Sequence, residues 1–164
     1  MALDVARGMA YLHSRTPPVI HRDLKSPNLL VDSNFKVKIC DFGMSRLMSH
    51  GYISTKGAAG TPQWCSPEVL SGDKFIDGKS DVWSFAVVLF ELVTQEVPWA
   101  GMTPQQSMYA MFAGRRLMMP DWVQPEVSAL VRDCWHEEAA ERPSFEEIIA
   151  RLGKLKELLN SKQG

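Results

Sequence analysis

The hydrophobic residues at the start of the chain follow a helical period. Val5, Met9 and Leu12 recur at spacings of three and four within MALDVARGMAYLHS, and this pattern predicts a helix with one apolar face. The prolines of RTPPVI end this helix, because proline cannot continue it. No capping residue precedes the first turn, so we expect a helix that was cut rather than one that begins here.

The pattern then changes to period two. In NLLVDSNFKVKI, the apolar residues Phe35, Val37 and Ile39 alternate with lysines, and residues 32–34 are turn formers, so a short β-hairpin is predicted. Residues 43–60 contain four glycines, several hydroxyl residues and weak periodicity. We expect a long mobile loop there, and long loops inside a compact domain tend to be functional.

The remainder of the chain returns to the helical period. The helix predicted over 81–95 is apolar nearly all round, which predicts a central position in the fold. Ser80 or Asp81 is its expected N-cap. Five helices are predicted in this part of the chain, over 66–72, 81–95, 103–114, 124–136 and 144–160.

The last predicted helix begins with a capping box, Ser144 with Glu147. We expect one domain over residues 1–159 and a frayed tail over 160–164. The residues predicted to form the buried stripe of this helix are Ile148, Ile149, Leu152, Leu155 and Leu159.

Composition narrows the class of protein without changing this picture. Of the 164 residues, 45% are hydrophobic and 23% are charged, which is typical of a globular domain. A net charge of −1 gives no general attraction for nucleic acid, so no nucleic-acid partner is expected. The apolar run VWSFAVVLFELV is too short to span a bilayer and no signal peptide is visible, so we expect no membrane insertion.

The three cysteines favour a reducing compartment. Cys40, Cys65 and Cys134 are odd in number and far apart, which argues against a disulfide framework and against a zinc site. We therefore expect buried or half-buried thiols and a cytoplasmic location.

Candidate chemistry gathers between residues 21 and 43. Asn28 and Asp41 flank the predicted hairpin, whose ends converge, and their amide and carboxylate oxygens are ligands suited to Mg²⁺. Asp23 could orient a hydroxyl nucleophile and accept its proton. Lys25 could neutralise charge on a moving phosphoryl group. Taken alone, these spacings fit simple turn residues equally well.

The same stretch resembles the catalytic and metal-binding loops of eukaryotic protein kinases. HRDLKSPN followed by Asp41-Phe42-Gly43 matches the motif pair of that family. Further motifs follow in order: GTPQW at 60–64, SPE at 66–68, SDVWSF at 80–85 and ERP at 141–143. The resemblance covers nearly the whole chain and implies a protein-kinase-like α+β fold. This chain would be its mainly α-helical C-terminal lobe with a small β-hairpin.

The resemblance implies a role for each polar residue of the loop. Asp23 resembles the catalytic base, and Lys25 resembles the lysine that contacts the transferring phosphate. Asn28 and Asp41 resemble the two Mg²⁺ ligands, and Leu30 resembles the residue that packs under the adenine ring. These roles imply ATP and Mg²⁺ as cofactors and a protein as substrate.

A second set of residues resembles those that hold a kinase site together. Thr61 matches the threonine that hydrogen-bonds Asp23 and Lys25 in serine/threonine kinases. Glu68 and Arg142 match a buried ion pair, and solvated surface charges are the alternative for them.

Three further motif positions have structural parts by the same resemblance. Asp81 matches the central-helix carboxylate that holds the catalytic-loop backbone, a role compatible with capping. His21 is expected to pack rather than react, and Phe42 and Gly43 complete their motif as structural residues.

The loop after residue 43 resembles a kinase activation loop. Ser54 and Thr55 are the nearest candidates for an activating phosphorylation, with Tyr52 and Ser49 behind them. A phosphate there would pair with Arg22 and order the loop.

The type of kinase follows from finer resemblances. Lys25 and GTPQW are similar to the serine/threonine type, and GTPQWCSPEVL resembles the tyrosine-kinase-like group, particularly mixed-lineage and Raf-like MAP kinase kinase kinases. The family analogy makes another kinase a candidate substrate.

One part of the kinase pattern is not found in the sequence. No glycine-rich G-x-G-x-x-G loop and no strand lysine precede the catalytic loop, so we expect the N-terminal lobe that covers the nucleotide to be missing. The isolated chain is then expected to have little phosphotransfer activity. The alternative is a non-catalytic, pseudokinase-like scaffold or binding fragment.

Overall fold

The fold is mainly helical, with three small pairs of strands. The computed structural model describes residues 1–48, 51–54 and 60–161. Its elements are α1 (Ala2–His13), β1 (Val19–Ile20), a 3₁₀ turn (Ser26–Asn28), β2 (Leu29–Val31), β3 (Val37–Ile39), β4 (Arg46–Leu47), β5 (Ile53–Ser54), α2 (Pro67–Leu70), β6 (Phe75–Ile76), α3 (Lys79–Thr94), α4 (Pro104–Phe112), α5 (Pro125–Cys134), a second 3₁₀ turn (Ala139–Glu141) and α6 (Phe145–Ser161).

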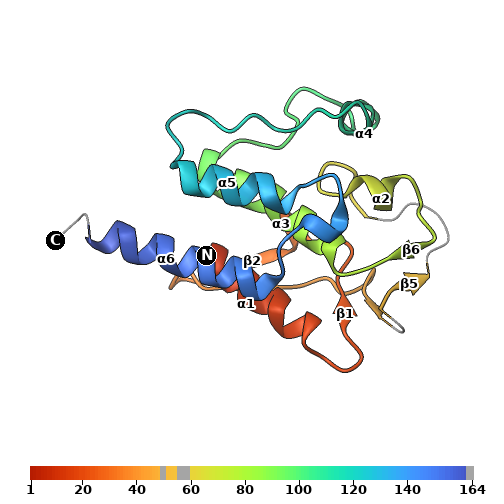
Figure 1. Ribbon diagram of the computed structural model, residues 1–164, viewed down its shortest axis with the longest axis horizontal. Coiled ribbons are helices and arrows are strands. Elements are labelled where there is room, and N and C mark those ends of the chain that lie inside the picture. The colour runs from red at the N-terminus through yellow and green to blue at the C-terminus, as the bar shows by residue number, and fades with distance from the viewer. Residues whose placement is uncertain (49–50, 55–59, 162–164) are drawn as a thin grey trace.

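Helix α3 is the centre of the core. Every residue from 80 to 90 is buried, so the prediction of a central helix that is apolar on nearly all sides is confirmed. Helix α5 packs on α3, and α1 and α6 lie side by side on the other side of it (Figure 1). The buried face of α1 includes Val5 and Met9, as the helical period predicted.

The start of α3 differs from the prediction. The helix begins at Lys79 with Gly78 at the N-cap, so neither Ser80 nor Asp81 caps it. Glycine fits this position because a Cβ there would lie 2.8 Å from the ring of His13. The carboxylate of Asp81 has no capping role and accepts hydrogen bonds from the loop after β1 instead.

Helix α6 confirms its predicted start. Ser144 and Glu147 exchange both capping hydrogen bonds, at 2.7 and 3.2 Å. The helix continues to Ser161, two residues beyond the predicted end of the domain. Leu159 was predicted to be buried and is not, since the end of α6 projects past the body of the protein (Figure 1) and leaves this side chain 43% exposed.

The predicted hairpin is present and ends earlier than its sequence pattern. Strands β2 and β3 pair antiparallel, with Leu29 opposite Ile39. Phe35 continues the alternation in sequence, but it lies in the turn at a positive φ of 58° and is 71% exposed. The alternation of apolar and polar residues in the sequence therefore includes Phe35, which belongs to the turn and not to β3.

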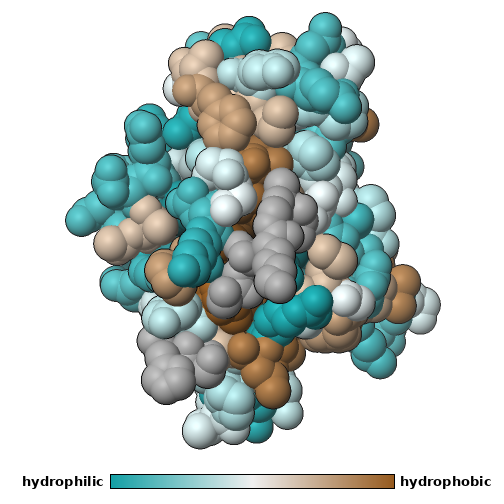
Figure 2. Space-filling view, turned by 90° about the vertical axis from the view of Figure 1, so that its right-hand side faces the viewer, coloured by the Kyte–Doolittle hydropathy of each residue, from teal (hydrophilic) through white to brown (hydrophobic). Residues whose placement is uncertain are grey.

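The loop predicted over 43–60 is partly ordered by pairing with distant segments. Strand β4 pairs with β1, and β5 pairs with β6. Ile53 of β5 is buried in a small second cluster with Ile20 and Ile76. On the face of the molecule that carries β5, β6 and α2, hydrophobic residues are visible between the polar residues that make up most of the surface (Figure 2). None of the described helices has the length and apolar character needed to cross a membrane.

Candidate active site

The carboxylate of Asp23 is the centre of a compact polar cluster. Its side chain is only 9% exposed. Oδ1 accepts hydrogen bonds from the backbone N–H of Thr61 at 3.0 Å and from its hydroxyl at 2.9 Å. Lys25 Nζ lies 2.7 Å from Oδ2 and also donates to the Thr61 hydroxyl oxygen at 2.7 Å. The contacts predicted between Thr61, Asp23 and Lys25 are therefore present.

Gly60 allows Thr61 to reach the cluster. Its φ is +96°, which side chains rarely adopt. A Cβ at this position would lie 2.7 Å from Cys65 Sγ and 2.8 Å from the carbonyl oxygen of Arg22. Any larger residue would push the 60–64 segment away from Asp23.

Asn28 joins the cluster from the other side. Its amide nitrogen donates to the Asp23 carbonyl oxygen at 2.8 Å and to Asp23 Oδ2 at 3.3 Å. The amide oxygen is left without a hydrogen-bond partner among the described residues. The backbone N–H of Cys40 donates to the Asn28 carbonyl oxygen at 2.9 Å, and so brings the residue before Asp41 next to Asn28.

Asp41 follows the last residue of β3 by two positions and lies outside this hydrogen-bonded cluster. It has a positive φ of 63°, is exposed, and accepts a hydrogen bond from the Gly43 N–H at 3.2 Å through Oδ1. Its Oδ2 and the amide oxygen of Asn28 have no hydrogen-bond partner in the described part of the chain, and both are hard oxygen atoms of the kind that Mg²⁺ takes as ligands.

The backbone before Asp23 is held by Asp81. Asp81 is fully buried, and its carboxylate accepts hydrogen bonds from the N–H groups of His21 at 2.9 Å and Arg22 at 2.8 Å. Arg22 has a positive φ of 70°, so these bonds hold a strained turn in place. The predicted contact between Asp81 and the loop is present. His13 adds a third bond at 2.9 Å, which the sequence did not predict.

His21 has the surroundings of a packing residue. It is fully buried, its Nε2 lies 3.2 Å from the Cys40 carbonyl oxygen, and its Nδ1 accepts from the Asp23 N–H at 3.4 Å. Its ring meets the edge of Phe42 at a centroid distance of 5.2 Å. These contacts tie the loop of Asp23 to the segment of Asp41.

Glu68 and Arg142 form an ion pair, so the alternative of solvated surface charges is excluded. Arg142 is 1% exposed, and its two terminal nitrogens donate to the two Glu68 oxygens at 2.6 and 2.9 Å. Burial alone would raise the pKa of Glu68, but several lowering causes, of which the hydrogen bond and charge of Arg142 are the largest, leave this pKa below its ordinary value.

The predicted regulatory residues are only partly described. Arg22 Nη1 donates to the Met44 carbonyl oxygen at 3.3 Å, and its buried Nε has no hydrogen-bond partner within the described part of the chain. Burial lowers the pKa of Arg22, and the nearby charge of Arg46 lowers it further. Only the backbone of Ser54 is described, and Thr55 and Ser49 lie outside the described residues.

Sequence reasoning missed Glu91, which joins both sides of the site. One carboxylate oxygen accepts from the Ser26 hydroxyl at 2.7 Å, and the other accepts from Trp64 Nε1 at 2.8 Å. Ser26 lies three residues after Asp23, and Trp64 lies three after Thr61. A single acidic residue in the apolar run of α3 was the available signal.

Replacement of Glu91 is expected to distinguish hydrogen bonding from charge. Burial raises the pKa of Glu91 despite its two hydrogen bonds. The folded state therefore favours the protonated carboxyl group. The stability that this protonation contributes is lost as the pH rises through the raised pKa. Glutamine resembles the protonated form, because it can accept from Trp64 and donate to Ser26. Urea unfolding at pH 7 should show Glu91→Gln at least as stable as the unmodified chain, and Glu91→Ala less stable by about 1–3 kcal/mol. An equal loss in both variants would contradict this reasoning.

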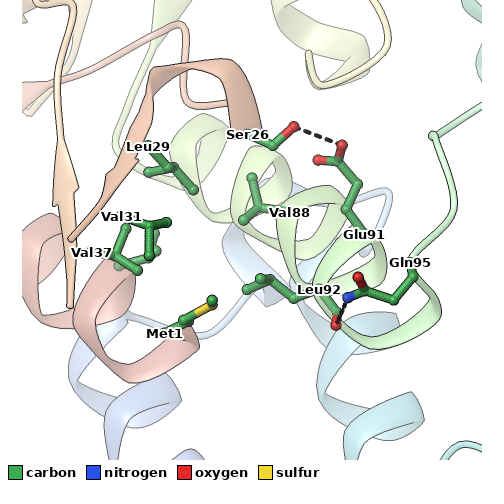
Figure 3. Close-up of a pocket in the computed structure, with 10 residues that line it drawn as sticks. Met1, Ser26, Leu29, Val31, Val37, Val88, Glu91, Leu92 and Gln95 are labelled. Carbon is green, nitrogen blue, oxygen red and sulfur yellow. Dashed lines mark hydrogen bonds between the residues drawn. The ribbon is translucent and has the colours of Figure 1, made fainter. Parts of the chain in front are cut away.

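A pocket of about 230 Å³ lies beside Glu91 (Figure 3). Leu29 and Val31 of β2 line it, together with Val88 and Leu92 of α3. Leu30 lies between them on the strand, so its side chain takes the opposite face, where it is 59% exposed. The exposed side chain of Leu30 is therefore separate from this pocket.

Comparisons with known proteins agree on one family. The family model described as "Protein tyrosine and serine/threonine kinase" matches residues 1–152. The chain is 52% identical over 156 residues to the probable serine/threonine-protein kinase SIS8 of Arabidopsis thaliana, and 51% identical over 156 residues to the serine/threonine-protein kinase CTR1 of the same plant. Both alignments cover 94% of this chain, but 15% and 19% of those relatives. The serine/threonine/tyrosine-protein kinase HT1 of Arabidopsis thaliana is 44% identical over 96% of the chain and 40% of its own length.

Proposed function

The chain belongs to the protein tyrosine and serine/threonine kinase family, and from that premise we propose that it carries the catalytic loop of a protein serine/threonine kinase. The reaction would transfer the terminal phosphoryl group of ATP to serine or threonine hydroxyls of a protein. The observation that carries this proposal is the buried carboxylate of Asp23, held by Thr61 and paired with Lys25.

Each residue of the cluster has a defined part in this reaction. Asp23 orients the substrate hydroxyl and accepts its proton, because it is the carboxylate at the centre of the cluster. Thr61 fixes Oδ1 and leaves Oδ2 to face Lys25. Lys25 offsets the negative charge of the moving phosphoryl group. Asn28 and Asp41 would hold Mg²⁺, which neutralises charge on the phosphates when bound.

The architecture supports assignment of the chain to the C-terminal lobe of the kinase fold. Helices α1 to α6 make up most of it, and the strands among the described residues form two-stranded pairs. Leu30 would pack under the adenine ring of ATP, since it is the most exposed residue of β2 and its side chain lies on the face opposite the pocket beside Glu91. We infer a cytoplasmic location from the odd number and wide spacing of the three cysteines in the sequence, which argue against a disulfide framework.

Serine/threonine specificity is supported by Lys25, Thr61 and the printed names of the relatives. The chain spans less than a fifth of the length of SIS8 and CTR1, so the activity of the whole protein and its substrates belong to this proposal. We place other kinases among the candidate protein substrates, on the likeness to Raf-like kinases. The scaffold alternative would be favoured by loss of a site residue, and Asp23, Lys25, Asn28 and Asp41 are all present.

The function is tested by phosphoryl transfer in the longest natural form of the protein. With Mg²⁺ and ATP, a generic protein substrate should gain phosphoserine and phosphothreonine, and removal of Mg²⁺ with a chelator should abolish the transfer. The Asp41→Asn variant, which has a weaker metal ligand, should need a higher Mg²⁺ concentration. Transfer to tyrosine alone would overturn the proposed serine/threonine specificity. A protein that still binds its partners but transfers no phosphate would favour the scaffold alternative.

Phosphorylation of the loop after residue 43 is expected to raise activity. Arg22 and Arg46 lie close enough for their charges to interact, and a phosphate would pair with Arg22. The double variant with Ser54→Ala and Thr55→Ala should transfer phosphate more slowly, by about tenfold or more, than the phosphorylated unmodified protein. Ser71→Ala, an exposed serine outside the loop, is the control. Undiminished activity of the double variant would assign activation to another residue.

A further inference from the structure

A second pocket lies far along the chain from the catalytic loop. It has a volume of about 300 Å³ and is lined by Arg116, Leu117, Met119, Ser128, Arg132 and Trp135. We call it the arginine pocket. The connection between α4 and α5 forms an arch above α5 (Figure 1), and the pocket lies between residues 116–119 of this connection and the face of α5 that carries Ser128 and Arg132, four residues apart.

Arg116 is held in one position by groups outside the pocket. Its Nη1 donates to the carbonyl oxygens of Met111 at 3.3 Å and Arg115 at 2.9 Å. Its guanidinium lies over the ring of Trp83, 4.8 Å from the centroid, and Arg142 lies 5.0 Å from the centroid of the same ring. The charged group of Arg116 is therefore preorganised, and binding a ligand would cost little side-chain ordering.

Several donors of the residues that line the pocket have no acceptor among the described residues. Within residues 1–48, 51–54 and 60–161, Nε and Nη2 of Arg116, the guanidinium of Arg132 and the hydroxyl of Ser128 have no hydrogen-bond partner. No acidic residue lines the pocket. The acids nearby are Glu137, whose charge reaches Arg116, and Asp133, which is paired with Arg151 at 2.7 Å.

The electrostatics of the pocket favour an anion. Burial lowers the pKa of Arg116, and of the two neighbouring charges, Glu137 opposes this change while Arg142 adds to it. A negatively charged ligand would offset the burial of this cation, and a carboxylate or phosphate group matches the paired N–H donors of a guanidinium.

The rest of the wall is apolar. Leu117 and Met119 line it from the connection, and Trp135, only 5% exposed, lines it from the end of α5. A volume of about 300 Å³ lies at the lower end of the range for small-molecule sites, which suits a ligand with about one ring.

We propose that the arginine pocket binds a small organic anion. Arg116 and Arg132 hold its carboxylate or phosphate group, and its apolar ring lies against Leu117, Met119 and Trp135. Ser128 supplies a further hydrogen bond to the anionic group. This site is independent of the proposed kinase reaction, because none of its lining residues belongs to the cluster around Asp23.

Isothermal titration calorimetry with the 164-residue chain tests the proposal. Phenyl phosphate and benzoate are the two anionic probes, and their relative affinities show whether the site prefers phosphate or carboxylate. At least one should bind with a stoichiometry of one, and benzyl alcohol and inorganic phosphate should each bind at least tenfold more weakly than that probe. Arg132→Gln should weaken binding at least tenfold, and Ser128→Ala should weaken it severalfold.

Arg115→Gln is the matched control, because Arg115 is an exposed arginine next to Arg116 that does not line the pocket. Its affinity for the probe should equal that of the unmodified chain. Unchanged binding in Arg132→Gln, equal binding of inorganic phosphate, or no binding of either aromatic anion at millimolar concentration would overturn the proposal. Arg132 is exposed and makes no hydrogen bond or ion pair with the described residues, so its replacement leaves the fold intact.

Discussion

Asp23→Asn is expected to reduce phosphoryl transfer by about 10²–10⁴-fold, the range that a positioned general base contributes. Asparagine has the size of aspartate but cannot accept the proton of the attacking hydroxyl. Its amide oxygen can still accept from Thr61, whereas its NH₂ group would face Lys25 Nζ and the Asn28 amide nitrogen, which are both donors. The loss therefore combines a missing base with a disturbed Lys25. Initial rates of the longest natural form of the protein, at saturating ATP and Mg²⁺, measure it.

Two controls separate this chemical effect from misfolding. The far-ultraviolet circular dichroism and the unfolding midpoint of the Asp23→Asn protein should resemble those of the unmodified protein. Lys25→Met, which removes the charge next to Asp23 but leaves the base, should retain more activity than Asp23→Asn. Transfer by Asp23→Asn within tenfold of the unmodified rate would show that Asp23 is not the base.

Elements with a local cause could be predicted from the sequence. The capping box of Ser144 and Glu147, the buried face of α1 and the β2–β3 hairpin each depend on neighbouring residues, and all three are present. The order of the polar residues in HRDLKSPN and of the later motifs likewise indicated which side chains belong to the site.

Contacts between distant segments could not be predicted from the pattern. The pairing of β4 with β1 and of β5 with β6 joins short runs that have no strand signal of their own. Gly78 replaces the predicted cap of α3 because the ring of His13, 65 positions earlier, lies against it. Which side chains of β2 face α3 and which face outward depended on the packing of that helix.

The same limit applies within the site. The spacing of Asp23, Asn28 and Asp41 suggested a metal and phosphate site, but spacing does not say which oxygen remains free. The structure shows that the Asn28 amide nitrogen is used by Asp23. The role of Glu91 was not predicted, because its partners, Ser26 and Trp64, lie 65 and 27 positions away in the sequence. A side chain's partners follow from the tertiary fold, and motif order reveals them only where a family pattern is known.

The Glu68→Gln replacement is expected to have the largest effect on stability, about 3 kcal/mol less free energy of unfolding at pH 7. Arg142 is almost fully buried, and Glu68 supplies its only charged hydrogen-bond partner among the described residues. Carbonyl oxygens of His136, Lys79 and Glu137 satisfy other N–H groups of Arg142 but carry no full charge. The variant would leave a buried cation without a counter-charge.

The pH dependence of this loss identifies the charge of Glu68 as its cause. The pKa of Glu68 is below its ordinary value of 4.5: burial raises it, but the lowering causes, chiefly the hydrogen bond and charge of Arg142, together outweigh burial. The stabilisation is therefore complete above pH 4.5 and disappears as the pH falls through the lowered pKa of the folded state. Urea unfolding at pH 7 and at successively lower pH should show the difference between the unmodified chain and Glu68→Gln shrinking below pH 4.5. Glu157→Gln, an exposed glutamate of α6, should unfold like the unmodified chain at every pH. A difference for Glu68→Gln that stays constant down to acid pH would mean that side-chain shape, rather than the ion pair, ties α2 to the segment before α6.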